Sequence, residues 1–172
     1  PHLIIWTGNN IKKAKQIFWD NLETFVQKKF LFDESAIVDK YSDLLTTVIK
    51  SDNISNKNLI NNKIYRISLS KLSKTNDRFR GRWGLFYEYE SNNIKELVSI
   101  VNSRYQTLTY YGYDKLTLRN FVISNRLSGI DRIVPIGKAL DIDLIWDGYD
   151  IINSLSRKVN LNWIFKNDKL TT

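Results

Sequence analysis

The sequence predicts an α/β fold with a mostly parallel sheet flanked by helices. The chain has 172 residues, of which 42% are hydrophobic, so it can bury a sizeable core. Its apolar residues alternate along the chain between β-type runs and runs with helical spacing, and the connections between these runs are short. Short βα connections are typical of parallel strands joined by right-handed crossovers. We therefore expect residues 1–172 to form a single domain.

The N-terminal part of the chain predicts one strand, two helices and a loop. Leu3–Trp6 is an apolar run of β type. Ile11–Phe30 carries apolar side chains at helical spacing, and Asp33 is suited to cap a second helix that follows it. Residues 51–62 are polar and rich in asparagine and show no periodicity, so they predict a loop.

The middle of the chain predicts strands and helices in alternation. Ile64–Leu72 reads as a strand whose odd and even residues face opposite sides of the sheet, and Leu85–Tyr89 reads as another strand. Ser91 is a cap residue before a helix expected over Ile94–Val101. Tyr105–Tyr111 predicts the next strand.

The C-terminal part continues this alternation. Asp114 is expected to cap a helix with Leu118 among its apolar positions, and Arg132–Ile136 predicts a further strand. We expect Asp147 to open a last helix that continues through Ile151–Leu155.

Composition narrows the possible functions. The chain has no cysteine, and its single histidine is His2, so a cysteine nucleophile, a disulfide and a Ser-His-Asp triad within this chain are not expected. The net charge of +8 permits anionic cofactors, acidic partners or nucleic acid, but the lysines are spread over helical segments, which favours solvated helix faces over nucleic-acid binding. We find no apolar run long enough for a membrane span and expect a cytoplasmic protein.

The densest group of turn-forming residues lies in the stretch 128–156. It holds three of the seven glycines, the only internal proline and five aspartates. Glycine and proline beside acids indicate either a shaped site or a set of tight turns with aspartate caps. Asp141, Asp143 and Asp147 have a spacing compatible with a carboxylate pair or a hard-metal site, but also with helix caps, and we expect no metal.

A second group of polar residues precedes the strand at Leu85. Arg78, Arg80 and Arg82 alternate in a glycine-containing segment. Such a segment can bind phosphates, or it can be a solvated loop or a charged edge that prevents sheet growth.

The stretch from Gly129 to Arg157 resembles the end of LuxC-type fatty acyl-CoA reductases, which belong to the aldehyde dehydrogenase superfamily. The pattern is a glycine, a basic residue in a strand, Pro-x-Gly, Leu-Asp and Trp-Asp-Gly-x-Asp, which here correspond to Gly129, Arg132, Pro135, Gly137, Leu140, Asp141, Trp146, Asp147, Gly148 and Asp150. The resemblance extends back to Arg82–Glu88, which lies where the superfamily has its strand near the nicotinamide ribose, and more loosely Pro1–Gly8 resembles the strand shortly after the catalytic cysteine.

This resemblance implies an α/β domain like the catalytic domain of aldehyde dehydrogenases. The complete enzyme would take a fatty acyl group from acyl-CoA, or from an acyl-protein partner, onto a cysteine and reduce the thioester to an aldehyde with NADPH. The chain would supply one wall of the pocket and no catalytic residue. The implied cofactor-binding residues are Arg82, Gly84 and Phe86, and the implied substrate-pocket residues are Trp146, Asp147 and Gly148.

The departures from the family pattern define what else is needed. The nucleophilic cysteine and the dinucleotide-binding domain are missing, and glycine or arginine stands where the superfamily has a ribose-binding glutamate. We therefore expect a C-terminal fragment that binds no cofactor alone. Its expected partners are the N-terminal part of the enzyme, an acyl-protein synthetase and further copies of itself. The alternatives are a non-catalytic basic binding module and a structural subunit.

Overall fold

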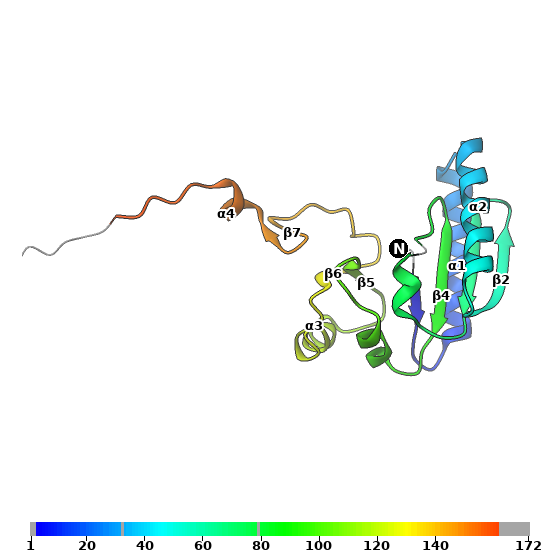
Figure 1. Ribbon diagram of the computed structural model, residues 1–172, viewed down its shortest axis with the longest axis horizontal. Coiled ribbons are helices and arrows are strands. Elements are labelled where there is room, and N and C mark those ends of the chain that lie inside the picture. The colour runs from blue at the N-terminus through cyan, green and yellow to red at the C-terminus, as the bar shows by residue number, and fades with distance from the viewer. Residues whose placement is uncertain (1–2, 32, 79, 162–172) are drawn as a thin grey trace, which may run out of the picture.

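The computed structural model describes residues 3–31, 33–78 and 80–161, and it has a mixed α/β fold (Figure 1). A mostly parallel sheet is flanked by helices, as the sequence predicts. The elements follow in the order β1 (Leu3–Trp6), α1 (Ile11–Lys29), α2 (Glu34–Lys50), β2 (Ile54–Ile60), β3 (Ile64–Leu69), the 3-10 helix η1 (Lys74–Arg78), β4 (Leu85–Glu90), the 3-10 helix η2 (Ile94–Ser99), β5 (Gln106–Tyr110), α3 (Lys115–Ser124), β6 (Ile130–Pro135), β7 (Ile145–Trp146), β8 (Tyr149–Asp150) and α4 (Ile151–Leu155).

The main sheet has four strands in the order β1-β4-β3-β2. β4 is central and runs parallel to both β1 and β3, with Tyr87 opposite Leu3 on one side and Ile67 on the other. β2 is the exception, because it pairs antiparallel with β3 at the edge of the sheet. The first strand of the chain therefore pairs with a strand that follows two helices and two further strands.

The prediction of a loop over residues 51–62 is wrong. Ile54–Ile60 forms β2, and Asn61 and Asn62 join it to β3 with positive φ angles of 50° and 54°. Asparagine tolerates this backbone conformation better than most residues, and two such residues suit a tight hairpin turn. The strand has no apolar periodicity because it lies at an exposed edge, where backbone hydrogen bonds to β3 rather than side-chain burial hold it in place.

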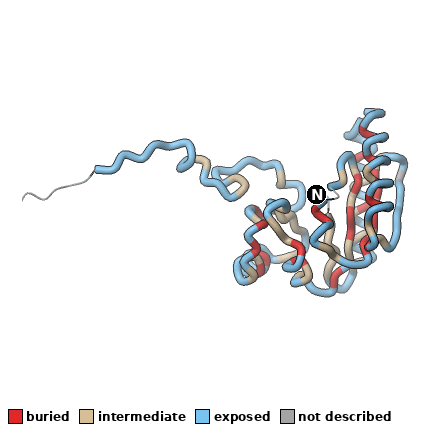
Figure 2. The backbone as a smooth tube through the Cα atoms, viewed as in Figure 1, coloured by how far each residue is buried: buried red, intermediate tan, exposed pale blue. Residues whose placement is uncertain are grey.

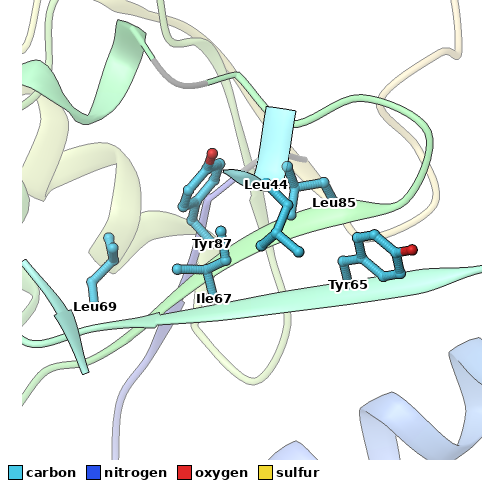
Figure 3. Packing of buried hydrophobic residues seen from close by; sticks show 6 residues of the cluster. All are labelled: Leu44, Tyr65, Ile67, Leu69, Leu85 and Tyr87. Atoms are coloured by element: carbon cyan, nitrogen blue, oxygen red, sulfur yellow. The ribbon is translucent and has the colours of Figure 1, made fainter. Parts of the chain in front are cut away.

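Helices cover both faces of the main sheet, and every residue of β3 is accordingly buried or half-buried. On one face, Leu44 of α2 packs against buried side chains of β3 and β4 that include Tyr65, Ile67 and Tyr87 (Figure 3). On the other face, α1 contributes Trp19 and Val26, which pack around Ile64. The two faces form separate hydrophobic clusters, so each helix is fixed by its own contacts.

The second half of the chain forms a smaller unit beside the main sheet. β5 and β6 are parallel and make a two-stranded sheet that α3 accompanies, with Asp114 as the N-cap of α3 as predicted. Leu97, Phe121 and Leu127 are the buried residues of its cluster. The predicted helix after Ser91 is a 3-10 helix capped by Asn93 instead, whose side chain accepts a hydrogen bond from the Lys95 amide at 2.9 Å.

The last described segment, residues 136–161, starts beside β6 and extends away from the main sheet (Figures 1 and 2). It contains the two-residue strands β7 and β8 and the short helix α4. The prediction that Asp147 opens this helix is wrong, because Asp150 is its N-cap and accepts a hydrogen bond from the Asn153 amide at 2.9 Å. Most residues of this arm are exposed, including apolar ones. No helix in the described ranges has the length and apolar character required to cross a bilayer.

Candidate functional site

A strongly charged concave surface, which we call the arginine hollow, lies between α2 and the segment around η1 that leads into β4. It has a volume of about 1060 Å³ and is lined by five cationic and two anionic side chains together with three hydroxyl-bearing ones. The lining residues are Asp43, Thr46, Thr47, Lys50, Asp77, Arg78, Arg80, Arg82, Tyr87 and Arg104. The three arginines that the sequence indicated are therefore brought together, and Arg104, Lys50 and the two acids were not anticipated.

A tight turn before β4 positions Arg82 at the hollow. The Leu85 amide donates a hydrogen bond to the Arg82 carbonyl at 3.0 Å, and Trp83 and Gly84 between them have φ angles of 56° and 89°. Positive φ at both central residues is the requirement of a type I′ turn, which explains the glycine at 84. The Gly84 carbonyl accepts a hydrogen bond from the Tyr65 amide at 2.9 Å, which fixes the turn to β3.

Two of the cations in the arginine hollow are paired with acids. Arg82 Nε lies 3.6 Å from Asp43 Oδ2, and Arg104 Nη1 lies 3.5 Å from Asp77 Oδ2. Asn102 also donates a hydrogen bond to Asp77 Oδ2 at 2.9 Å. These pairs attach the arginines to α2 and η1, so their side chains are oriented by the fold.

The hydroxyl groups on the α2 side of the hollow form a short buried network. Thr47 Oγ1 and the Tyr87 hydroxyl are 2.7 Å apart, and Thr47 also donates to the Asp43 carbonyl. Burial raises the pKa of Tyr87 to about 12, so this phenol stays neutral at physiological pH. This hydroxyl pair therefore adds no charge to the hollow, and the arginines and Lys50 that line it are exposed.

Phe86 does not lie with Arg82. Neighbouring residues of a strand point to opposite faces of a sheet, and Phe86 faces α1, where its ring meets Trp19 edge-on with a centroid distance of 5.4 Å. Of the three implied cofactor-binding residues, Arg82 lines the hollow, Gly84 shapes the turn beside it, and Phe86 belongs to the hydrophobic cluster on the other side of the sheet.

A second polar centre, which sequence reasoning missed, surrounds Glu88 of β4. Its carboxylate is 2% exposed and receives hydrogen bonds from the Trp6 indole at 2.9 Å and from Arg66 Nη2 at 2.8 Å. Trp19 and Ser68 donate at 3.3 Å, and the Lys15 ammonium is also 3.3 Å away. Burial alone would raise the pKa of Glu88, but the nearby charges of Arg66 and Lys15 and the hydrogen bonds bring it below its ordinary value. A carboxylate so fully bonded is a structural anchor rather than a free acid or base.

The C-terminal motif is organised around Arg132 of β6. Its guanidinium donates hydrogen bonds to the carbonyls of Ala139 and Asp141, each at 2.9 Å, and lies 4.1 Å from the centre of the Trp146 ring. Arg132 is 9% exposed. These contacts fold the loop between β6 and β7 back over the strand and leave a smaller hollow of about 380 Å³ beneath it.

Turns account for Gly137 and Gly148 of this motif, whereas Gly129 passes so close to another segment that a Cβ there would lie 2.0 Å from the Asn102 carbonyl oxygen. The Lys138 amide donates to the Pro135 carbonyl at 3.1 Å, and Gly137 has a φ angle of 89° at the position where a type II turn requires it. Asp147 and Gly148 join β7 to β8 with φ angles of 48° and 82°. A Cβ on Gly148 would lie 3.2 Å from Asp131 Oδ1, so the hairpin turn also lies close to β6.

The aspartates of the motif serve local structure. Asp141 pairs with Lys138 at 2.9 Å, and Asp143 Oδ1 accepts from the Leu144 amide at 2.7 Å. Among the residues that the structure describes, no three acidic or histidine side chains come together in a way that could hold a metal ion. This stretch thus contains tight turns and one aspartate cap, which is Asp150 rather than Asp147.

The implied cofactor and substrate residues do not meet in one pocket of this chain. Arg82 and Gly84 lie at the main sheet, whereas Trp146, Asp147 and Gly148 lie in the arm beyond β5 and β6 (Figure 1). No family model, curated protein or solved structure matches the chain.

Proposed function

We propose that the chain is the C-terminal part of the catalytic domain of an NADPH-dependent fatty acyl-CoA reductase of the LuxC type. The observation that carries this proposal is the packing around Arg132. The residues of the family-like motif are not scattered, because Arg132 bonds the Asp141 carbonyl and stacks on Trp146, and the Asp147-Gly148 turn follows directly. A motif whose members contact one another is a structural unit, which supports a genuine rather than accidental resemblance.

The reaction in the complete enzyme would proceed through a thioester. A cysteine thiolate would displace coenzyme A from the acyl-CoA, and NADPH would supply the hydride that reduces the acyl carbon. With uptake of one proton, the C–S bond breaks to give the aldehyde, the free thiol and NADP⁺. Since this chain holds no cysteine, the nucleophile has to come from a segment outside the printed sequence.

Within this proposal the chain's own residues position and shape rather than react. The main sheet supports the turn that carries Arg82, and Glu88 fixes α1 against that sheet. Arg132 holds the loop and hairpin that contain Trp146, Asp147 and Gly148, which would form a substrate-side wall once the missing segment is in place.

Reconstitution tests the proposal. The 172-residue chain is co-expressed with the cysteine-bearing N-terminal segment of a LuxC-type reductase, and NADPH oxidation is followed with tetradecanoyl-CoA. We expect turnover from the co-expressed pair, none from either part alone, and none when the cysteine is replaced by alanine. A purified pair that forms a stable complex without turnover, or turnover by the chain alone, contradicts the proposal.

A non-catalytic module that binds an anionic partner is the second candidate. The observation that favours it is the excess of cations over acids in the arginine hollow. Strong retention on heparin that falls steeply with salt, together with failed reconstitution, would favour this candidate.

A further inference from the structure

The arginine hollow carries positive charge that the chain does not neutralise. Asp43 and Asp77 pair with Arg82 and Arg104, at 3.6 and 3.5 Å. Within the part of the chain that the structure describes, Lys50, Arg78 and Arg80 have no carboxylate within ion-pair distance, although they line the same hollow. Like charges gathered on a concave surface repel one another, and a bound anion would relieve that repulsion.

Close backbone contacts fix the segment that carries Arg80 and Arg82. Arg80 donates a hydrogen bond to the Arg104 carbonyl, which joins the segment before β4 to the segment before β5. Between Arg80 and Arg82, a Cβ on Gly81 would lie 2.2 Å from the Leu85 carbonyl oxygen, so only glycine allows the chain to pass there. Because these contacts fix the backbone at Arg80 and Gly81, this part of the loop needs no reordering when an anion binds.

The chemistry of the lining side chains selects the kind of anion. A guanidinium presents parallel N–H groups that match two oxygens of a phosphate or of a carboxylate at once, and a phosphate group can carry more negative charge than a carboxylate. The three unpaired cations favour a group with more than one negative charge, and Thr46 at the edge of the hollow adds a hydroxyl donor. A volume of about 1060 Å³ is ample for a nucleotide-sized molecule.

We propose that the arginine hollow binds the phosphate groups of a small phosphate-bearing ligand. The choice of natural ligand rests on the proposed function, because NADPH and acyl-CoA both carry a phosphomonoester and a diphosphate. The site itself rests only on the charges and geometry of this chain.

Titration calorimetry of the 172-residue chain with inorganic pyrophosphate tests the site directly at low ionic strength. We expect saturable binding that the double variant Arg78→Gln/Arg80→Gln weakens by on the order of tenfold or more, since each charge-assisted hydrogen bond contributes about that much. Lys115→Gln/Arg119→Gln removes two charges from the exposed surface of α3 and is the matched control, expected to bind as the wild type does. Absence of pyrophosphate binding, or equal weakening by the control, overturns the proposal.

Competition against pyrophosphate then identifies the source of the phosphate. Stronger displacement by NADPH than by NADH assigns the site to the cofactor, and stronger displacement by CoA than by dephospho-CoA assigns it to the acyl carrier. Displacement by duplex DNA but by none of these small molecules overturns the proposal in favour of a nucleic-acid surface. Pyrophosphate binding without reconstituted reductase activity contradicts the proposed function alone, whereas reductase activity without pyrophosphate binding contradicts this inference alone.

Discussion

Arg66 directs two nitrogen atoms at one oxygen of Glu88, with Nη2 at 2.8 Å and Nε at 3.2 Å from Oε1. The two residues belong to adjacent parallel strands, β3 and β4. The guanidinium of Arg66 also lies 4.3 Å from the centre of the Trp19 ring, so it is held between the carboxylate and α1. One buried ion pair thereby joins two strands to a helix. It is a polar contact within the otherwise apolar packing between α1 and the main sheet.

Replacing Glu88 by glutamine should strongly destabilise the protein. The change leaves Arg66 and Lys15 facing a neutral amide in a buried position, and breaking one partner of such a pair costs about 3–5 kcal/mol. The measurement is the free energy of unfolding from urea denaturation. Glu90→Gln is the matched control, because Glu90 also pairs with Lys15 but is 56% exposed, and it should change stability by less than about 1 kcal/mol. Similar values for the two variants would contradict the anchoring role of Glu88.

The stability of the protein should rise with pH above about pH 8 because of Lys40. This lysine of α2 is buried and donates hydrogen bonds to the carbonyls of Asn62 and Lys63, and burial lowers its pKa from 10.5 to about 8. Between these two values the unfolded chain binds more protons than the folded one, so the free energy of unfolding increases with pH, by at most about 1.4 kcal/mol per pH unit. Below pH 8 both states are protonated and the contribution is constant.

Urea denaturation at about pH 7.5 and about pH 9.5 measures this effect. The window ends below the range in which tyrosines with raised pKa values, such as Tyr87, would lower stability as the unfolded chain ionises. Lys40→Met removes the titrating group and should flatten the profile. A wild-type profile as flat as that of the variant would mean that Lys40 keeps its proton throughout.

Gly148→Ala should open the β7–β8 hairpin. Its φ angle of 82° disfavours any Cβ, and the added methyl group would also press on Asp131 at 3.2 Å. We expect a local cost of at least about 1 kcal/mol, measured as faster amide hydrogen exchange at Trp146 and Tyr149. Gly137→Ala is the control, since its φ angle is 89° but no atom lies within 4 Å of the added Cβ. Each variant is compared with the wild type for the rate of hydrogen exchange at its own turn. A larger increase for Gly148→Ala than for Gly137→Ala measures the effect of the Asp131 contact, and equal increases would mean that this contact is absent.

The isolated chain should associate with itself. The arm exposes large apolar side chains, among them Leu140 at 87% and Ile142 at 84%, and exposed apolar patches tend to pair. Light scattering should show a mass that increases with concentration, and Leu140→Ser/Ile142→Ser should reduce it. A monomeric mass over a wide concentration range would show that these side chains do not cause self-association.

Local sequence signals predicted most elements of the fold. The run at Leu3–Trp6, the caps Asp33 and Asp114 and the helical spacing after Ile11 all act within a few residues, and each is found where it was predicted. β2 escaped prediction because its stability comes from pairing with β3 and not from its own side chains. Asp147 was mistaken for a cap because two aspartates lie three residues apart, and only the backbone shows that the first one makes the turn and the second begins the helix.

The candidate site was predictable only in part for the same reason. The sequence shows the alternation of Arg78, Arg80 and Arg82 because the three arginines lie in one short segment. Lys50 and Arg104, in contrast, reach the arginine hollow only through the tertiary fold. Glu88 gave no signal, because it lies in a strand whose pattern is otherwise apolar and aromatic, and its partners Trp6, Lys15 and Arg66 come from three other elements. Contacts between distant segments follow from strand order, which periodicity does not encode.

The position of β1 at the side of β4 has a consequence for folding during synthesis. The indole of Trp6 donates to a carboxylate 82 residues further along the chain, and β4 is the strand with which β1 pairs. A ribosome that adds about 5–20 residues per second needs roughly 4–16 s to make that interval. Throughout this time, the β2–β3 hairpin and both helices can form, while the apolar segment at Leu3–Trp6 waits without its strand partner. β1 is therefore translated well before the strand with which it pairs, and its exposure in the nascent chain during that interval is a natural point of engagement for chaperones.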